Sequence, residues 1–145
     1  MKILIDGDGC PVVAKTISIA KKFDVEVLLL TDTAHSFSRT DVKILTFDKG
    51  RDSVDFALVN KVSRGDVVVT QDYGLAAMVL ARGGYAISQN GMIYDEFNID
   101  SLLFARAASK KARDAGVRLK GPSKRSHADD EAFEKSFMKL LQSLS

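Results

Sequence analysis

Cysteine is almost absent from this sequence, which has 145 residues and a single thiol, Cys10. An internal disulfide is therefore excluded, and this composition is typical of a reducing compartment. No apolar run approaches the roughly 18–20 residues that span a bilayer. The first acidic residue, Asp6, follows only three apolar residues, which is too short a stretch for a secretion signal. We therefore expect a cytoplasmic protein without a membrane anchor.

The sequence also lacks the glycine-rich loops that cradle nucleotide phosphates, so a nucleotide cofactor has no support. Excess charge of one sign is lacking as well, because 21 basic and 19 acidic residues give a formal net charge of +2. Hydrophobic residues make up 46% of the chain and charged residues 28%, as in ordinary folded proteins. The length predicts a single domain over residues 1–145.

Short continuous apolar segments alternate with helical patterns along the chain. Strands are predicted at residues 3–5, 25–30, 42–47, 67–69 and 85–88, and most of them lack the polar alternation of a half-exposed strand. Helices are predicted to begin at Pro11, near residue 53, at residue 75 and after a cap at Asn98. This order predicts an α/β fold of three α/β/α layers around a mainly parallel sheet.

A last helix is predicted over about residues 127–144, with Ser126 and Asp129 spaced as in a capping box. Its apolar residues recur at helical spacing and need cover from the rest of the domain. They are Phe133, Phe137, Leu140, Leu141 and Leu144.

Aspartates follow several of the predicted strands. Asp6 and Asp8 come after the first strand and Asp72 after the fourth, whereas Asp52 and Asp55 belong to the helix start that follows the third. Ligands of open parallel sheets bind beyond the carboxyl ends of the strands, so we expect these acids at one edge.

Such a cluster needs a counterion. Two carboxylates ~6 Å apart repel by about 3 kcal/mol at an effective dielectric constant of 20. A bound Mg²⁺ or Mn²⁺ would remove this repulsion, and metal ions of this kind can clamp a phosphodiester. Aspartate is also a common turn former and helix cap, and that interpretation stays open, above all for Asp32, Asp48 and Asp52.

The segment Asp6-Gly7-Asp8-Gly9 after an apolar strand has two further interpretations. An EF-hand loop is excluded, because Pro11 and Ile17 stand where that loop needs glycine and glutamate. A phosphatase of the haloacid-dehalogenase type stays an alternative, with Asp6 as nucleophile and Asp8 as acid/base. The lysine and later acid pair of that superfamily have no clear counterpart here.

Four segments resemble the YaiI/YqxD family of bacterial proteins, which belongs with PIN-like domains. They are Asp6-Gly7-Asp8-Gly9-Cys10-Pro11, Asp52-Ser53-Val54-Asp55, the stretch from Gly65 through Asp72, and Gly121-Pro122. The resemblance covers nearly the whole chain. The family usually has alanine where this chain has Gly9, a change that leaves the acids intact.

The resemblance implies a PIN-like domain with an acidic, metal-dependent nuclease site. Asp6, Asp55 and Asp72 match the acids of such sites, and Asp8 and Asp52 would be additional metal ligands. The catalytic set would be Asp6, Asp8, Asp55 and Asp72. PIN nucleases usually supply a fourth acid after the position of Asp72, where this chain has Tyr73 and Gly74.

The small net charge conceals a basic segment over residues 110–125. This segment carries a net charge of +6 and leaves −4 for the remainder. Its basic residues are Lys110, Lys111, Arg113, Arg118, Lys120, Lys124 and Arg125. They are candidate contacts for a phosphate backbone, although a solvated helix face is an open alternative. No aromatic residue interleaves with these cations, so the sequence indicates no stacking platform for single strands.

Together these patterns predict a metal-dependent nuclease or phosphodiesterase that acts on nucleic acid. RNA is favoured over DNA by family analogy. The alternative from another class is a catalytically inactive module that binds nucleic acid through the basic segment.

Overall fold

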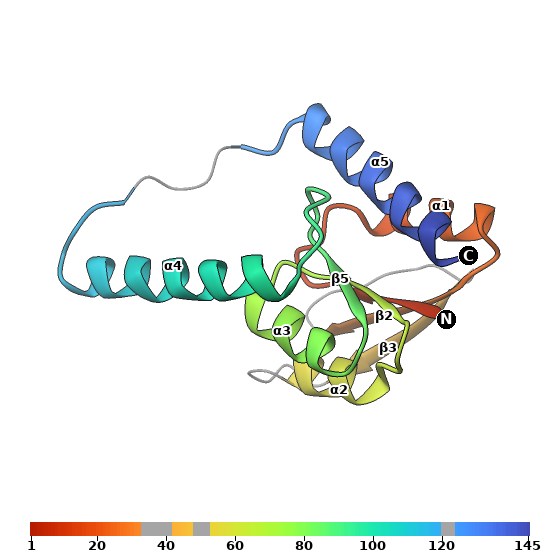
Figure 1. Cartoon of the computed structure of the whole chain (residues 1–145), viewed down its shortest axis with the longest axis horizontal. Coiled ribbons are helices and arrows are strands. Elements are labelled where there is room, and N and C mark those ends of the chain that lie inside the picture. Colours follow the sequence, from red (N-terminus) through yellow and green to blue (C-terminus); the bar gives the residue numbers. More distant parts are fainter. Residues whose placement is uncertain (33–41, 48–52, 120–123) are drawn as a thin grey trace.

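The fold is built on a five-stranded sheet in which all strands run parallel (Figure 1). The computed structural model describes residues 1–32, 42–47, 53–119 and 124–145. The strands are β1 (Lys2–Asp6), β2 (Glu26–Asp32), β3 (Lys43–Phe47), β4 (Val67–Val69) and β5 (Tyr85–Ile87), in the spatial order β3-β2-β1-β4-β5. The central strand β1 therefore pairs with β2 on one side and with β4 on the other.

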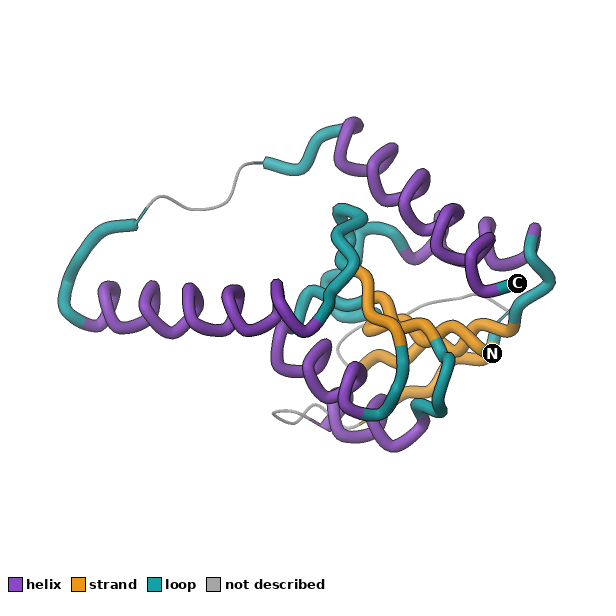
Figure 2. Tube along the Cα trace, in the orientation of Figure 1, coloured by secondary structure: helices purple, strands orange, loops and turns teal. Residues whose placement is uncertain are grey.

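Helices cover both faces of the sheet, which confirms the predicted three-layer α/β arrangement (Figures 1 and 2). The helices are α1 (Val13–Lys22), α2 (Ser53–Lys61), α3 (Tyr73–Ala81), α4 (Glu96–Asp114) and α5 (His127–Leu144). α1 and α5 lie on one face, whereas α2, α3 and the first part of α4 lie on the other. Each face of the sheet thus has its own hydrophobic core.

The central strand shows why the apolar segments are continuous. Ile3 and Ile5 belong to the core under α1 and α5, whereas Leu4 belongs to the core under α2 and α3. All three side chains are fully buried. A strand covered on both faces needs apolar residues at every position, and this is the pattern that predicted a parallel sheet.

The C-terminal helix α5 packs where its apolar stripe predicts. Phe133 and Phe137 are fully buried against α1, with their rings stacked at a centroid distance of 5.2 Å. The predicted capping box is present, because the carboxylate of Asp129 accepts a hydrogen bond from the Ser126 backbone N–H at 2.9 Å. Both the extent and the buried face of the predicted helix are confirmed.

Three predicted helix starts are wrong by a few residues, and one of them is that of α3, which begins at Tyr73 rather than at residue 75. α4 begins after Asp95, whose side chain accepts hydrogen bonds from the N–H groups of Phe97 and Asn98. Asn98 is instead the third helical residue and accepts from the Asp95 N–H at 2.9 Å. α1 begins at Val13 rather than at Pro11. Sequence alone did not distinguish the cap from its partner within one capping box.

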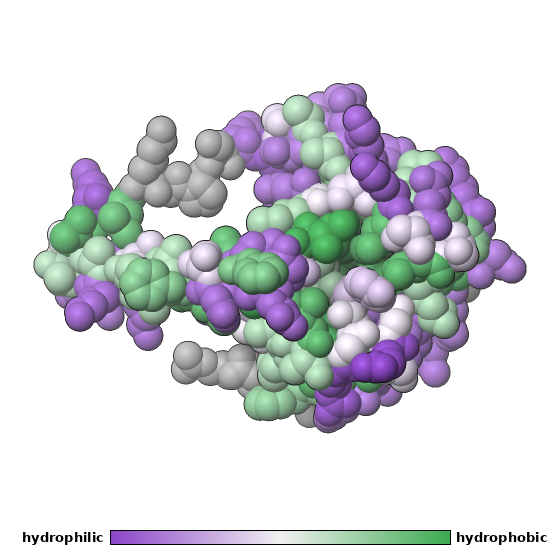
Figure 3. All heavy atoms as spheres, in the orientation of Figure 1, coloured by the Kyte–Doolittle hydropathy of each residue, from purple (hydrophilic) through white to green (hydrophobic). Residues whose placement is uncertain are grey.

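The second half of α4 projects beyond the sheet (Figure 1). Only Ile99 of this 19-residue helix is fully buried, whereas the side chains of Phe97 and Phe104 are 85% and 78% exposed. In Figure 3, hydrophobic and hydrophilic side chains alternate over this projecting part. Among the described residues, no helix combines the length and hydropathy that a membrane span requires.

Candidate functional site

The strand order marks one place in the sheet where a ligand is expected. From β1 the chain builds outward through β2 to β3, and from β4 it builds outward to β5 in the other direction. Doubly wound sheets bind ligands at such a switch point, beyond the carboxyl ends of the two inner strands. Asp6 is the last residue of β1, and Thr70 directly follows β4. These two residues therefore stand at the switch point.

Thr70 links the two halves of the sheet at this edge. Its hydroxyl donates a hydrogen bond to Asp6 Oδ2 at 2.8 Å and accepts one from the Asp72 backbone N–H at 3.0 Å. Asp72 Oδ1 in turn accepts from the Leu75 N–H at 3.1 Å and so caps α3. Asp72 is thus both a helix cap and a neighbour of Asp6. The interpretation of the acids as helix caps and their interpretation as a charged cluster are therefore compatible at this position.

The loop after β1 positions Asp8 against the end of β2. Asp8 Oδ1 accepts hydrogen bonds from the Thr31 hydroxyl at 3.0 Å and from the Asp32 N–H at 3.2 Å. The loop can lie this close because residue 7 is glycine, and an added Cβ there would stand 2.8 Å from Leu29 Cδ1. The glycine of the Asp6-Gly7-Asp8 segment is therefore required by packing.

Asp6 and Asp8 open into a small cavity of about 50 Å³. Its lining comes from the loops after β1, β4 and β5, namely Asp6, Asp8, Gly9, Cys10, Val69, Thr70, Gln71 and Gln89. Ordinary small-molecule pockets measure about 300–1,000 Å³, so this cavity suits an ion with its waters or one phosphate oxygen.

The electrostatics of the cavity are dominated by its acids. Burial raises the pKa of Asp6 from 3.8 to about 6, opposed by the hydrogen bond from Thr70 and reinforced by the negative charges of Asp8 and Asp72. A carboxyl group with a raised pKa in a cavity is a candidate functional group, because its ionised form lacks compensation there.

The predicted acidic cluster is only partly assembled. Asp55 is half-buried in the first turn of α2 and does not line the cavity. Asp72 does not line it either, and its contribution is that of a negative charge near Asp6. Asp48 and Asp52 lie outside the described residues, and so does His35. Within residues 1–32, 42–47, 53–119 and 124–145, no three His, Cys, Asp or Glu side chains stand close enough together to ligate one ion. The roles of the five acids as metal ligands therefore stay predictions.

The arrangement of these acids fits an ion held by one or two carboxylates better than an ion held by three or more. Mg²⁺ keeps several waters and is commonly held by one or two carboxylates together with substrate phosphates. Asp6 and Asp8, with Asp72 beside them, suit that mode of binding. An ion coordinated directly by three or more carboxylates does not fit the described side chains.

Sequence reasoning missed two residues of this cavity. The side-chain oxygen of Gln71 accepts a hydrogen bond from the Gln89 N–H at 2.9 Å and joins the loops after β4 and β5. The position of Gln71 directly after a buried strand was a usable signal, as it was for the acids. Gln89 carries the same signal, since it follows the strand predicted at residues 85–88, but only the pairing of β5 with β4 brings its loop to the cavity.

The described basic residues of the segment lie on α4 and on the stretch that follows it. Lys110, Lys111 and Arg113 are exposed on the projecting half of α4, and Arg118 and Lys124 are exposed in the segment after it. Lys120 lies outside the described residues. No finding tests whether these side chains bind nucleic acid, so that role remains a prediction.

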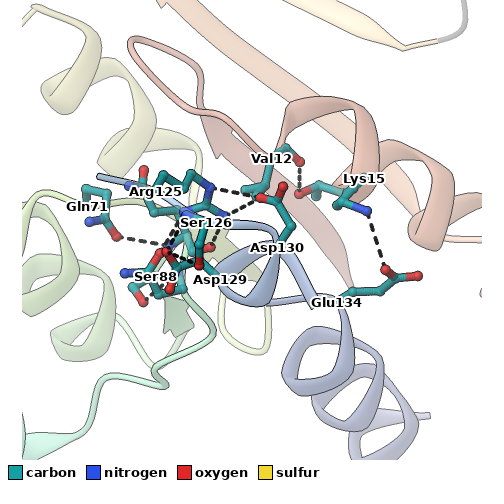
Figure 4. Close-up of polar contacts among 12 residues, drawn as sticks. Val12, Lys15, Gln71, Ser88, Arg125, Ser126, Asp129, Asp130 and Glu134 are labelled. Carbon is teal, nitrogen blue, oxygen red and sulfur yellow. Dashed lines mark hydrogen bonds and ion pairs between the residues drawn. The ribbon is translucent and has the colours of Figure 1, made fainter. Parts of the chain in front are cut away.

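Arg125 holds α5 against the loop beside the cavity (Figure 4). Its guanidinium donates to Asn90 Oδ1 at 2.6 Å, to the Gln89 carbonyl oxygen at 2.9 Å and to Asp130 Oδ1 at 2.8 Å. The Ser136 hydroxyl adds a hydrogen bond to the Gly91 carbonyl at 2.6 Å. These partners give the Arg125 guanidinium a positioning role, and its phosphate contact stays a prediction.

Comparison with known sequences assigns the chain to a bacterial family. Residues 4–143 match the family described as "Uncharacterized BCR, YaiI/YqxD family". A UPF0178 protein of Exiguobacterium sibiricum is 52% identical over 141 residues, which cover 97% of this chain and 96% of that protein. A UPF0178 protein of Clostridium acetobutylicum is 49% identical over 143 residues, which cover 97% of each. No solved structure matches the chain. The chain therefore belongs to the YaiI/YqxD family, as its four motifs indicate.

Proposed function

We propose that this protein is a metal-dependent phosphodiesterase that cleaves RNA at the cavity between β1 and β4. One observation carries the proposal. The carboxyl group of Asp6 is mostly buried at the switch point of the sheet, with two further acids beside it. Burial, reinforced by the negative charge of these acids, raises its pKa to about 6. Uncompensated negative charge in a small cavity is relieved by a divalent cation.

The residues of the cavity have distinct roles in this proposal. Asp6 and Asp8 hold Mg²⁺ or Mn²⁺, and Asp72 adds negative charge beside them. The bound ion supplies an activated water and polarises the phosphate. Thr70 orients the Asp6 carboxylate through its hydrogen bond and keeps the Asp72 backbone in place. Asp55 and Asp52 can act as the predicted metal ligands only if their side chains approach this cavity.

RNA rather than DNA follows from the PIN-like resemblance of the family. The exposed cations of α4 and the segment after it supply the electrostatic attraction for a phosphate backbone.

The test is cleavage of a 5′-labelled RNA in the presence of Mn²⁺. Asp72→Asn keeps the helix cap, since asparagine caps helices as well as aspartate does, but removes the charge. We expect it to lower the cleavage rate at least about 100-fold, which corresponds to about 2.7 kcal/mol in the barrier. Equal cleavage by Asp72→Asn and wild type would overturn the proposal.

A matched control is available at the next helix. Asp95 caps α4 as Asp72 caps α3, but it is exposed and, unlike Asp72, is not one of the charged neighbours that raise the Asp6 pKa. Asp95→Asn makes the same chemical change at the same kind of position, so we expect its cleavage rate to stay within about twofold of wild type. A comparable loss in both variants would assign the effect to the helix caps and not to the cavity.

A second candidate function is a nucleic-acid-binding module without catalysis. It is favoured by the absence, among the described side chains, of a three-acid group that could ligate one ion. Titration calorimetry with Mn²⁺ distinguishes the two functions. Heat of binding in the wild type that disappears in Asp6→Asn supports the phosphodiesterase, and no heat above buffer background supports the module.

The phosphatase interpretation loses support from the same geometry. In the described part of the cavity lining there is no lysine, which that reaction requires. A raised pKa also keeps part of the Asp6 population protonated near pH 6 and so weakens it as a nucleophile. Beryllofluoride should therefore form no complex at Asp6.

A further inference from the structure

A groove runs along one face of α4. It has a volume of about 280 Å³ and is lined by Tyr73, Leu102, Ala105, Arg106, Ser109 and Arg113. Tyr73 directly follows Asp72 in the chain and is the first residue of α3. The groove therefore begins at the residue after Asp72 and leads along the projecting helix, and among the described residues it shares none of its lining with the cavity of Asp6 and Asp8.

Two arginines give this groove a positive charge. Arg106 and Arg113 are exposed and stand seven residues apart, which is about two turns or roughly 10.5 Å along one helix face. Arg113 lies in the last turn, where it also interacts favourably with the helix dipole. Arg106 lies mid-helix, so the dipole does not account for its presence. One guanidinium group can bind a phosphate through two parallel N–H···O hydrogen bonds.

An aromatic ring lies at the end of the groove nearest the acids. The Tyr73 ring is half-exposed and packs edge-on against Tyr94, with ring centroids 6.1 Å apart and planes at 64°. The Tyr94 hydroxyl donates to the Thr70 carbonyl at 3.1 Å, which fixes this pair relative to the end of β4. The sequence indicated no aromatic among the basic residues, and the fold brings one there from a distant segment.

We propose that the groove holds single-stranded RNA, with phosphates on Arg106 and Arg113 and a base stacked on Tyr73. Stacking on a fixed ring requires an unpaired base, which favours a single strand over a duplex. The next phosphate then lies toward Asp6 and Asp8. The direction of the strand rests on the proposed function, whereas its binding can be measured without cleavage.

A matched control is available on α5. Lys135 and Lys139 are exposed and stand four residues apart on that helix. Neither lines the groove, and neither belongs to the basic segment. The double variant Lys135→Glu, Lys139→Glu therefore reverses the same number of charges as Arg106→Glu, Arg113→Glu, on another exposed helix.

The experiment is fluorescence anisotropy of a labelled single-stranded RNA, about twelve nucleotides long, in EDTA so that no cleavage occurs. We expect the double variant Arg106→Glu, Arg113→Glu to weaken binding at least tenfold, and Lys135→Glu, Lys139→Glu to stay within twofold of wild type. Neutral replacement of both arginines by glutamine should reduce the salt slope by about 1.4, because each phosphate contact on a single strand contributes about 0.7.

The base contact is tested in the same assay. Tyr73→Leu should weaken binding about five- to tenfold, whereas Tyr73→Phe should not. Tyr85→Leu, at a tyrosine that begins β5 at the opposite edge of the sheet, is the control. Circular dichroism melting verifies that each variant is folded. If a charge-reversal variant does not fold, the charge-neutral Arg106→Gln takes its place.

These outcomes distinguish RNA binding in the groove from phosphodiester cleavage at the acidic cavity. Equal losses for Lys135→Glu, Lys139→Glu and the arginine double variant would overturn the groove, as would equal competition by an unlabelled RNA duplex or no binding at all. Binding that depends on Arg106, Arg113 and Tyr73, without any Mn²⁺-dependent cleavage, supports the groove and refutes the phosphodiesterase.

Discussion

Two aspartates at opposite ends of the inner strands of the sheet show how differently one residue type can be used. Asp66 precedes β4 at the amino edge and is 3% exposed, whereas Asp6 ends β1 at the carboxyl edge and is mostly buried. Asp66 pairs with the Lys2 ammonium at 2.6 Å and accepts from the N–H groups of Lys2 and Ser63. Asp6 has Thr70 as its hydrogen-bond donor and the acids Asp8 and Asp72 as charged neighbours.

The pKa values of the two groups move in opposite directions. Burial acts to raise the pKa of Asp66, but the hydrogen bonds and charge of Lys2, together with the Ser63 N–H, hold it below the usual range. At Asp6, burial prevails and the neighbouring acids add to it. The different partners of the two carboxylates thus leave one compensated and the other in need of a cation, which is why the carboxyl edge is the candidate site.

The largest predicted effect is at the compensated aspartate. Asp66→Ala removes the acceptor of two N–H groups and leaves the partly buried Lys2 ammonium without its partner. We expect the free energy of unfolding at pH 7 to fall by about 3 kcal/mol, the lower end of the range for breaking a buried ion pair. Urea unfolding measures this, with the exposed Asp100→Ala as control.

The pH dependence sharpens this prediction. Because the pKa of Asp66 is lowered on folding, its stabilising contribution is complete at neutral pH and decreases as the pH falls below the ordinary carboxyl range. The difference between wild type and Asp66→Ala should therefore shrink toward pH 3. A loss below about 1 kcal/mol at pH 7, or a loss independent of pH, would contradict the contrast with Asp6.

Asp6→Asn should change the free energy of unfolding in the opposite direction to Asp66→Ala. The folded protein holds the Asp6 proton up to a pH of about 6 and the unfolded chain releases it near 3.8, so wild-type stability falls as the pH rises through this window. Without divalent ions at pH 7.5, we expect the variant to be more stable than wild type by about 2 kcal/mol, and the gain to vanish below pH 4.

Divalent ions provide the second readout for this variant. Added Mn²⁺ should raise the unfolding midpoint of wild type and leave that of Asp6→Asn nearly unchanged, because an ion that binds only the folded state stabilises it. Urea unfolding from pH 3.5 to 8 in EDTA, repeated with Mn²⁺, measures both effects. A variant less stable than wild type at every pH would show that Asp6 is structural, as Asp66 is.

The smallest predicted effect concerns the hydroxyl that orients Asp6. Thr70→Val removes a hydrogen bond that lowers the Asp6 pKa, so this pKa should rise above about 6 while the free energy of unfolding falls by about 1 kcal/mol. Carboxyl carbon NMR titration measures the pKa.

Thr16→Val is the matched control for this substitution. The Thr16 hydroxyl donates to the Val12 carbonyl at 2.7 Å inside α1, so its loss should cost about the same stability and leave Asp6 unchanged. An unchanged Asp6 titration in Thr70→Val would remove Thr70 from the candidate site.

Much of the candidate site was predictable from local patterns. A strand apolar at every position, such as residues 3–5, must be covered on both faces, and that implies parallel neighbours whose carboxyl ends share one edge. Asp6, Asp8 and Asp72 follow from this rule. The rule places residues at an edge without giving their separations, so it did not show that Asp55 stands apart from the cavity lining.

The sequence by itself determined the layers of the fold, the buried face of α5 and the edge where the acids gather, because periodic burial and turn residues act over a few positions. Only the tertiary structure decided that Thr70 joins Asp6 to Asp72, that Arg125 fastens α5 to the loop at Gln89, and that Tyr73 lies along a groove with Arg106. These contacts join residues far apart in the chain, and their distances depend on which strands pair and how each helix packs.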